Sequence, residues 1–333
     1  MKIDHNFPFD PTNGMSKEEL LQIPPSEEPE NFREFWEETY ALVWNAPLKY
    51  TVETELWSPV PEEKIFRVRA VNWDNTEITM WITRPEESKG AVLLGQGYGH
   101  PKMPSDDYFI YLMSKESDAT PLRPSSPLGL TLCHPMVRGL GASQCKKFPW
   151  LPAEHVLHGI GSRETYILRG VIADEWLAVR VLLDMFPDCA ENLNYVGGSM
   201  GGGMGALLLP WEKRFRRAVL HVPTFGAPIR FKYQTEGAGE VCRKYLEEHP
   251  EAIDVLKYFD ASVSAAYIQI PVCCTPALFD PCVAPAGQFS IINGIREEYK
   301  TLMIRETGHF DITPRDKEVE TQLRAWCKEN FLR

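Results

Sequence analysis

The chain has 333 residues, a hydrophobic fraction of 44% and a formal charge of −11, which suits a globular protein and excludes a disordered or fibrous one. The 35 Lys and Arg residues are outnumbered by 46 Asp and Glu and form no basic stripe, so we expect no general binding to nucleic acid or to an anionic membrane. There is no apolar run of about 18 residues, no signal-peptide core and no CxxC pair among the eight cysteines; together these features predict a cytoplasmic protein.

The N-terminal quarter of the chain, residues 1–85, predicts an extension of a larger domain. Residues 1–30 are rich in Pro, Asp and Glu and lack an apolar period, which indicates an extended arm. In residues 31–44, aromatic side chains recur at helical spacing and predict an amphipathic helix. Three alternating segments follow and predict antiparallel strands, with Asp74-Asn75 as a turn: 50–57, 64–73 and 76–85. We expect residues 1–85 not to fold independently.

From residue 86 onward the pattern predicts one α/β domain that reaches residue 333. Apolar runs typical of buried strands alternate with helical patterns, which favours a mostly parallel, doubly wound sheet. The expected strands are 91–99, 130–141, 192–199, 217–225, 270–280 and 299–310, and the expected helices are 170–186, 201–215 and 317–332. Loop-rich insertions are expected near 115–128 and 143–170.

The sharpest local motif is Gly197-Gly198-Ser199-Met200-Gly201. Its glycines permit a tight strand–turn–helix that exposes the serine hydroxyl. That hydroxyl needs a base to become nucleophilic, and the base needs an orienting carboxylate. Asp280 and His309 each end a later strand, in the Ser–Asp–His chain order of α/β-hydrolases. We therefore expect an α/β-hydrolase with Ser199 as nucleophile, Asp280 as orienting group and His309 as base.

Each of these residues also has a simpler interpretation. The glycines of 197–205 could serve only a closely packed helix start, Asp280 could be a turn residue before Pro281, and His309 could be a loop or capping residue. A dinucleotide-binding motif is less well supported, because no acidic partner for a ribose follows. The order of all three residues at three strand ends favours catalysis over packing.

An acyl-transfer site also needs two backbone N–H groups as an oxyanion hole. One belongs to the residue after the nucleophile, Met200, and the other to the loop after an early strand. The loop 95–99 is glycine-rich, and we assign the second N–H to Tyr98. An ordinary glycine turn is the alternative.

A metal site is not expected. His155 and His158 stand three residues apart and could share a helix face, but no third ligand follows at useful spacing. The histidine spacing therefore predicts no metal site.

Over nearly its whole length the chain resembles the acetyl xylan esterase and cephalosporin-C deacetylase family, carbohydrate esterase family seven. The matching segments are PENFREFWEE, WITRP, GYG at 97–99, Arg138-Gly139, HGI followed by ETYILRGVIAD, GGSMGG, LKYFD, ALFDPCVAP and TGH. Their order and spacing are more specific than the serine motif alone.

The resemblance implies a serine esterase that deacetylates small sugars such as xylo-oligosaccharides, or cephalosporin-like esters, through an acyl-enzyme. It implies the triad Ser199, Asp280 and His309, with the backbone N–H groups of Tyr98 and Met200 as the oxyanion hole. It further implies a small-molecule ester as the partner, no cofactor, and a ring-shaped homohexamer with inward-facing sites.

The sequence departs from the family pattern around the expected site. The departures are Gln96 for the usual His, Leu140 for Gln, Met200 for Gln and Phe310 for Glu. They leave the acyl and alcohol groups of the substrate open. Other acyl hydrolases, acyltransferases and peptidases on the same fold remain alternatives, as does a catalytically silent oligomeric binding protein.

Overall fold

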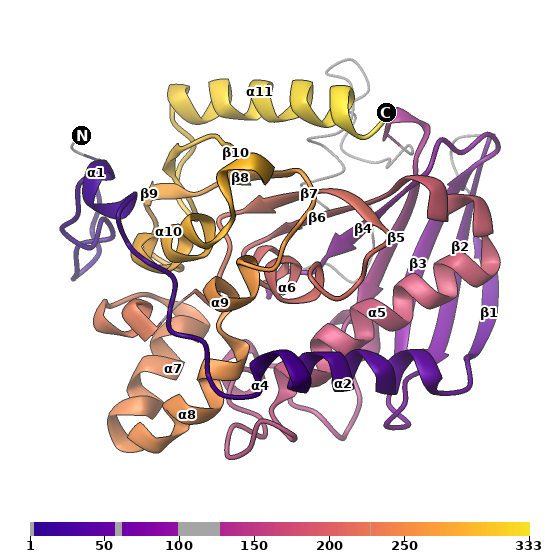
Figure 1. Cartoon of the computed structure of the whole chain (residues 1–333), viewed down its shortest axis with the longest axis horizontal. Coiled ribbons are helices and arrows are strands. Elements are labelled where there is room, and N and C mark those ends of the chain that lie inside the picture. The colour runs from indigo at the N-terminus through magenta and orange to yellow at the C-terminus, as the bar shows by residue number, and fades with distance from the viewer. Residues whose placement is uncertain (1–2, 57–61, 99–126, 227) are drawn as a thin grey trace.

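The computed structural model in Figure 1 describes residues 3–56, 62–98, 127–226 and 228–333. Most of the insertion predicted at 115–128 lies outside these residues, as does Gly99 of the predicted glycine loop.

Within the described residues, nine strands form one sheet in the order β1-β2-β3-β5-β4-β6-β7-β8-β10. Neighbours from β1 to β5 are antiparallel, and those from β5 to β10 are parallel. The expected mainly parallel α/β sheet with an antiparallel extension is confirmed. The strands are β1 (Lys49–Leu56), β2 (Glu63–Val71), β3 (Glu77–Pro85), β4 (Ala91–Gly95), β5 (Thr131–Met136), β6 (Leu193–Gly198), β7 (Phe215–His221), β8 (Val272–Thr275) and β10 (Lys300–Leu302).

Helices cover both faces of this sheet; in Figure 1, α11 lies above it and α2 and α5 lie below it. The helices are α1 (Lys17–Leu20), α2 (Phe32–Asn45), α4 (Pro152–His155), α5 (Ile167–Met185), α6 (Met200–Leu208), α7 (Gly237–Glu248), α8 (Ile253–Leu256), α9 (Ala261–Ala265), α10 (Pro285–Gly294) and α11 (Pro314–Asn330).

Several expected boundaries were wrong. The helix expected over 201–215 ends at Leu208, because Pro210 follows closely and has no N–H to donate to the next helical hydrogen bond. The insertion expected over 143–170 contains α4, and its last residues already belong to α5. Sequence analysis assigned no element to the segment that forms α7, α8 and α9.

Strands β4, β5 and β6 are buried on both faces, which explains why they read as continuous apolar runs. In β4, Val92 and Leu94 belong to the core beneath α11, whereas Ala91 and Leu93 belong to the larger core on the α5 and α6 side. Trp36 of α2 is fully buried in that larger core, so the N-terminal quarter and the rest of the chain share one hydrophobic interior. That residues 1–85 cannot fold alone stays a prediction.

Two predicted strands are each divided in two. Pro276 separates β8 from β9 (Ala277–Phe279), and β10 is likewise followed, after a break, by β11 (Arg305–Thr307). Proline has no N–H for a ladder hydrogen bond, so regular pairing stops there. Strands β9 and β11 pair in parallel as a small second sheet, and Asp280 and His309 follow their ends.

The N-terminal arm packs against this small sheet. The rings of Phe7 and Phe310 lie 5.7 Å apart in an edge-to-face contact, and Phe279 lies 5.1 Å from Phe310. The N–H of Asp280 donates to the carbonyl of Pro11 at 3.1 Å. The arm therefore supports both loops that carry the expected orienting carboxylate and base.

No helix in the described part of the chain is long and apolar enough to cross a membrane.

One ionisable group lies deep in the core away from these loops. Glu175 of α5 is completely buried, and within the described residues neither of its carboxyl oxygens has a hydrogen-bond partner. Burial, reinforced by the negative charge of Asp174, holds the pKa of Glu175 well above its usual 4.5. The folded protein therefore keeps this carboxyl protonated when the unfolded chain ionises it.

We predict that Glu175→Gln removes part of the pH dependence of stability. Above pH 4.5 the unfolded state loses the Glu175 proton and the folded state retains it, so the wild type loses up to about 1.4 kcal/mol per pH unit from this group. Urea unfolding between pH 5 and 8 should show the variant gaining stability over the wild type as pH rises. The surface variant Glu87→Gln is the control. If the difference in unfolding free energy between Glu175→Gln and the wild type stays constant with pH, Glu175 is not protonated in the folded protein as we infer.

Candidate functional site

Ser199 sits at a strained turn between β6 and α6. Its backbone has φ 55° and ψ −119°, a conformation that residues other than glycine rarely adopt. Backbone hydrogen bonds stabilise this conformation. The N–H of Ser199 donates to the carbonyl of His221, and its carbonyl accepts from the N–H groups of Gly203 and Thr224, at 2.9 to 3.1 Å. The side chain is left half-buried at the carboxyl edge of the sheet, where open α/β sheets bind ligands.

The turn requires α6 to touch the strands directly. A Cβ atom added to Gly201 would lie 2.2 Å from the carbonyl oxygen of Gly95 in β4, so only glycine fits there. The hydroxyl of Tyr195 donates to the carbonyl of Gly201 at 2.6 Å. The glycines therefore serve close packing and, through it, the position of Ser199.

Asp280 and His309 form a bonded pair. Nδ1 of His309 lies 2.9 Å from Oδ2 and 3.1 Å from Oδ1 of Asp280. The carboxylate is fully buried and also accepts from the N–H groups of Cys282 and Val283 and from the side-chain amide of Gln288, each at 2.9 Å. These donors fix its orientation toward the imidazole.

The position of His309 depends on a glycine and on charge. A Cβ at Gly308 would lie 2.0 Å from Oδ2 of Asp280, so the preceding residue must be small for the loops to meet. Burial alone would lower the pKa of His309, but the charge and hydrogen bond of Asp280 outweigh it and raise the pKa above its usual 6.5. A histidine with Nδ1 held by a carboxylate presents Nε2 for proton transfer.

Tyr98 is held by a histidine that is not part of this pair. The Tyr98 hydroxyl lies 3.2 Å from Nδ1 of His155, and Nε2 of His155 lies 2.9 Å from the carbonyl oxygen of Arg138. A carbonyl can only accept, so Nε2 carries the proton and the tyrosine hydroxyl donates to Nδ1. Burial lowers the pKa of His155 to about 4, which keeps it neutral in this role.

Arg138, whose carbonyl accepts from His155, is itself held by ion pairs. Its guanidinium binds Asp174 and Asp74 at 2.7 to 2.9 Å, and its backbone N–H also donates to Asp174. Nearby, Gln96 accepts from the N–H of Val137 at 3.0 Å. The loop after β4 is thereby tied to the end of β5, which fixes the backbone of Tyr98.

The departures from the family pattern lie outside the cavity. Gln96 bridges two strand ends, Leu140 and Met200 belong to the hydrophobic core, and Phe310 joins the aromatic contact with the arm. None of their side chains lines the cavity beside Ser199. These four changes therefore alter the support of the site more than its lining.

A cavity of about 440 Å³ contains Ser199, His309 and Tyr98 in its wall. Asp280 lies behind His309, and Met200 begins α6 directly after Ser199, its N–H free of intrahelical bonding because it is the first helical residue. The remaining wall comes from α4, the segment after β7, the start of α7 and the loop after Asp280. Its lining is mainly apolar, including Val156, Phe225 and Val283.

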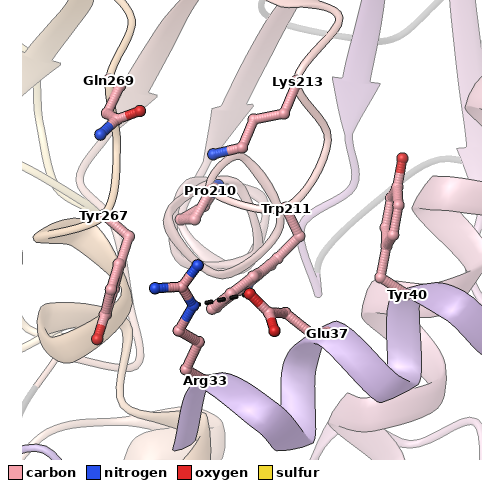
Figure 2. A pocket seen from close by; sticks show the side chains of 8 residues that line it. All are labelled: Arg33, Glu37, Tyr40, Pro210, Trp211, Lys213, Tyr267 and Gln269. Atoms are coloured by element: carbon pink, nitrogen blue, oxygen red, sulfur yellow. Dashed lines mark hydrogen bonds and ion pairs between the residues drawn. The ribbon is translucent and has the colours of Figure 1, made fainter.

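A second, smaller pocket of about 270 Å³ lies between α2, the end of α6 and the segment after α9. Figure 2 shows its wall, in which Arg33 and Glu37 of α2 form an ion pair beside Trp211. It contains none of the expected catalytic residues.

Ligand-type atoms of Asp280, Cys282 and His309 lie within 4.8 Å of one another, the single such group within the described residues. Two of the three already bond each other as an Asp–His pair. His155 and His158 do not act together, because both ring nitrogens of His155 are engaged and His158 packs edge-to-face on Phe148.

Neither the contact of Gln288 with Asp280 nor the role of His155 was expected from the sequence. Gln288 lies on α10 and reaches Asp280 only through the fold, so no local spacing marks it. For His155 the signal was its place in a histidine-containing insertion close to the family segment HGI, but that signal suggested metal binding and not support of Tyr98.

A strained serine at a strand–helix turn, together with an Asp–His pair at neighbouring strand ends, defines an α/β-hydrolase. Acetyl xylan esterase 1 from Thermoanaerobacterium sp. JW/SL YS485 matches with a TM-score of 0.75 at 18% identity, over 93% of this chain and 98% of that one. An acetyl xylan esterase from Paenibacillus sp. R4 matches with 0.75 at 20%, over 93% and 99%. Prolyl oligopeptidase B from Galerina marginata matches with 0.54 at 17%, over 81% of this chain but 36% of its own length.

The family model for acetyl xylan esterase (AXE1) matches residues 13–327. The chain therefore belongs to the acetyl xylan esterase (AXE1) family, and family and fold together indicate a carboxylic ester hydrolase.

We predict that Gly201→Ala destabilises the protein by about 2 kcal/mol or more, because its methyl group would collide with the β4 backbone. Gly161→Ala is the matched control, since nothing lies within 4 Å of a Cβ atom there. Thermal unfolding of both variants measures the difference. Equal melting temperatures would show that α6 does not need to touch β4.

Proposed function

We propose that the protein is a serine esterase that removes acetyl groups from small esters through an acyl-enzyme. The observation that carries the proposal is the Asp280–His309 pair in hydrogen-bond contact, with His309 and the strained Ser199 in the wall of one cavity. The proposed substrates are small acetylated sugars such as xylo-oligosaccharides, or cephalosporin-like esters.

In the first half of the proposed reaction, Nε2 of His309 takes the proton of the Ser199 hydroxyl as its oxygen attacks the ester carbonyl carbon. The resulting imidazolium is stabilised by the buried carboxylate of Asp280. The tetrahedral intermediate then expels the alcohol, which receives the proton from His309. The acetyl group remains on Ser199.

The negative oxygen of the tetrahedral intermediate needs donors that are already in place. The N–H of Met200 is suited to this because it begins α6 and has no acceptor within the helix. The N–H of Tyr98 is the second proposed donor, and the contact of its hydroxyl with His155 supports a fixed backbone at that point.

In the second half, His309 removes a proton from water, and the resulting hydroxide attacks the acetyl carbonyl. Collapse of the second tetrahedral intermediate returns the proton to Ser199 and releases acetate. The free base form of His309 is required at both attacks, so activity should rise with pH as the imidazolium loses its proton.

We predict that Ser199→Ala lowers kcat for p-nitrophenyl acetate by more than about 1000-fold, because the nucleophile is lost. Circular dichroism should show that the variant is folded. Ser162→Ala, outside the cavity, is the control and should keep wild-type turnover. Full turnover by Ser199→Ala, or failure of a fluorophosphonate probe to label Ser199 in the wild type, would overturn the serine mechanism.

We also predict a preference for short acyl groups. A sugar-sized alcohol must share the 440 Å³ cavity with the acyl group, which leaves little space for a long chain. The value of kcat/KM should fall at least about tenfold from the p-nitrophenyl acetate to the octanoate ester, and acetylated xylo-oligosaccharides should release acetate. Substantial activity on long acyl chains alone would contradict the deacetylase proposal.

A further inference from the structure

Arg230 brings a positive charge to the wall of the cavity that contains Ser199 and His309. It lies in η6 (Pro228–Lys232), a short 3-10 helix between β7 and α7. Its side chain is half-buried, unlike that of its neighbour Lys232, which is exposed and does not line the cavity.

The arginine side chain is held in position by apolar contacts. Its guanidinium lies 4.4 Å from the ring centre of Phe231 and 5.6 Å from that of Phe225, distances typical of cation–π contacts. Its stem passes close to Gly287 of α10, where an added Cβ would lie 3.0 Å from the Cβ of Arg230. Little side-chain freedom is therefore left to lose when a ligand binds.

Among the described residues, Arg230 forms no ion pair. The two buried arginines of the described residues do: Arg138 binds Asp74 and Asp174, and Arg305 lies 3.5 Å from Glu320. A guanidinium has five N–H donors, and aromatic faces satisfy none of them as hydrogen bonds. Arg230 thus keeps its planar donor face for a group that enters the cavity.

Glu236 also lines the cavity, but it does not neutralise this charge. It is exposed at the start of α7 and forms no ion pair with Arg230. Solvent screens an exposed charge much more than a half-buried one. Burial raises the pKa of the Cys242 thiol to about 11, and the charge of Arg230 acts against that rise, so the positive charge is felt within the cavity wall.

We propose that Arg230 binds an anionic group, a carboxylate above all, in the alcohol portion of the ester substrate. The inference rests on the proposed function, because an acetyl group carries no charge and the anion must then belong to the alcohol. The fork of guanidinium N–H donors matches the two oxygens of a carboxylate. The preferred substrates are acetyl esters of hydroxy acids or of sugars that bear an acid group.

The test compares charged and neutral versions of one ester. The probes are 3- and 4-acetoxybenzoate and their methyl esters, and the readout is the ratio of kcat/KM for the acid to that for its methyl ester. This ratio does not depend on the fraction of active enzyme, so a partly unfolded variant still reports. We expect Arg230→Met to lower the ratio about tenfold for at least one isomer, as for loss of a charged hydrogen bond.

Two matched variants separate direct binding from general charge effects. Arg230→Lys keeps the charge without the fork and should lose less of the ratio than Arg230→Met. Lys232→Met removes a positive charge from the same short helix outside the cavity and should leave the ratio unchanged. An unaltered ratio in Arg230→Met for both isomers, or an equal fall in Lys232→Met, would overturn the anion site.

Failure of the proposed function gives a different result. If the wild type hydrolyses none of these acids or methyl esters, or if Ser199→Ala still hydrolyses them, the serine esterase is wrong and the anion site is wrong with it. If hydrolysis depends on Ser199 while the ratio is insensitive to Arg230, only the anion site is wrong.

Discussion

Helix α6 and strand β4 touch backbone to backbone, and the rest of the site depends on this contact. Because Gly201 has no side chain, the first turn of α6 can approach the carbonyl of Gly95, and the chain must then reverse sharply at Ser199. The reversal puts a single non-glycine residue into an unfavourable backbone region. Hydrogen bonds from two neighbouring segments hold it there, so the exposed hydroxyl follows from packing between elements and not from local propensity.

The partners of Ser199 come from a part of the fold that is built differently. Asp280 and His309 follow β9 and β11, which pair with each other as a separate two-stranded sheet. Pairing with the main sheet ends before them, at Pro276 in the case of β9. Such a pair is too small to be stable alone; the arm, α10 and α11 pack against it. The two halves of the site therefore have separate supports, one inside the main sheet and one at its margin.

Much of this arrangement could be predicted from the sequence, for physical reasons that also set the limit. Parallel strands are buried on both faces, so each appears in the sequence as a continuous apolar run. The residues after those runs meet at one edge of the sheet, which is how Ser199, Asp280 and His309 could be identified as candidates. Their catalytic roles stay a prediction. Gln288 and the Tyr98–His155 contact depend on which elements meet in space, and periodicity within one element carries no such information. The same limit explains why Leu140 and Met200 looked like changes in the site, when their side chains face the core.

The aromatic contact between Phe7 and Phe310 favours an apolar residue at the position after His309. A glutamate after the histidine, the usual family residue, would place a charge against the arm's ring and the face of Phe279. The phenylalanine and the aromatic arm are thus physically coupled, because each supplies apolar surface that the other contacts. A chimera that joins this arm to a relative with glutamate at that position would bring a carboxylate against aromatic rings.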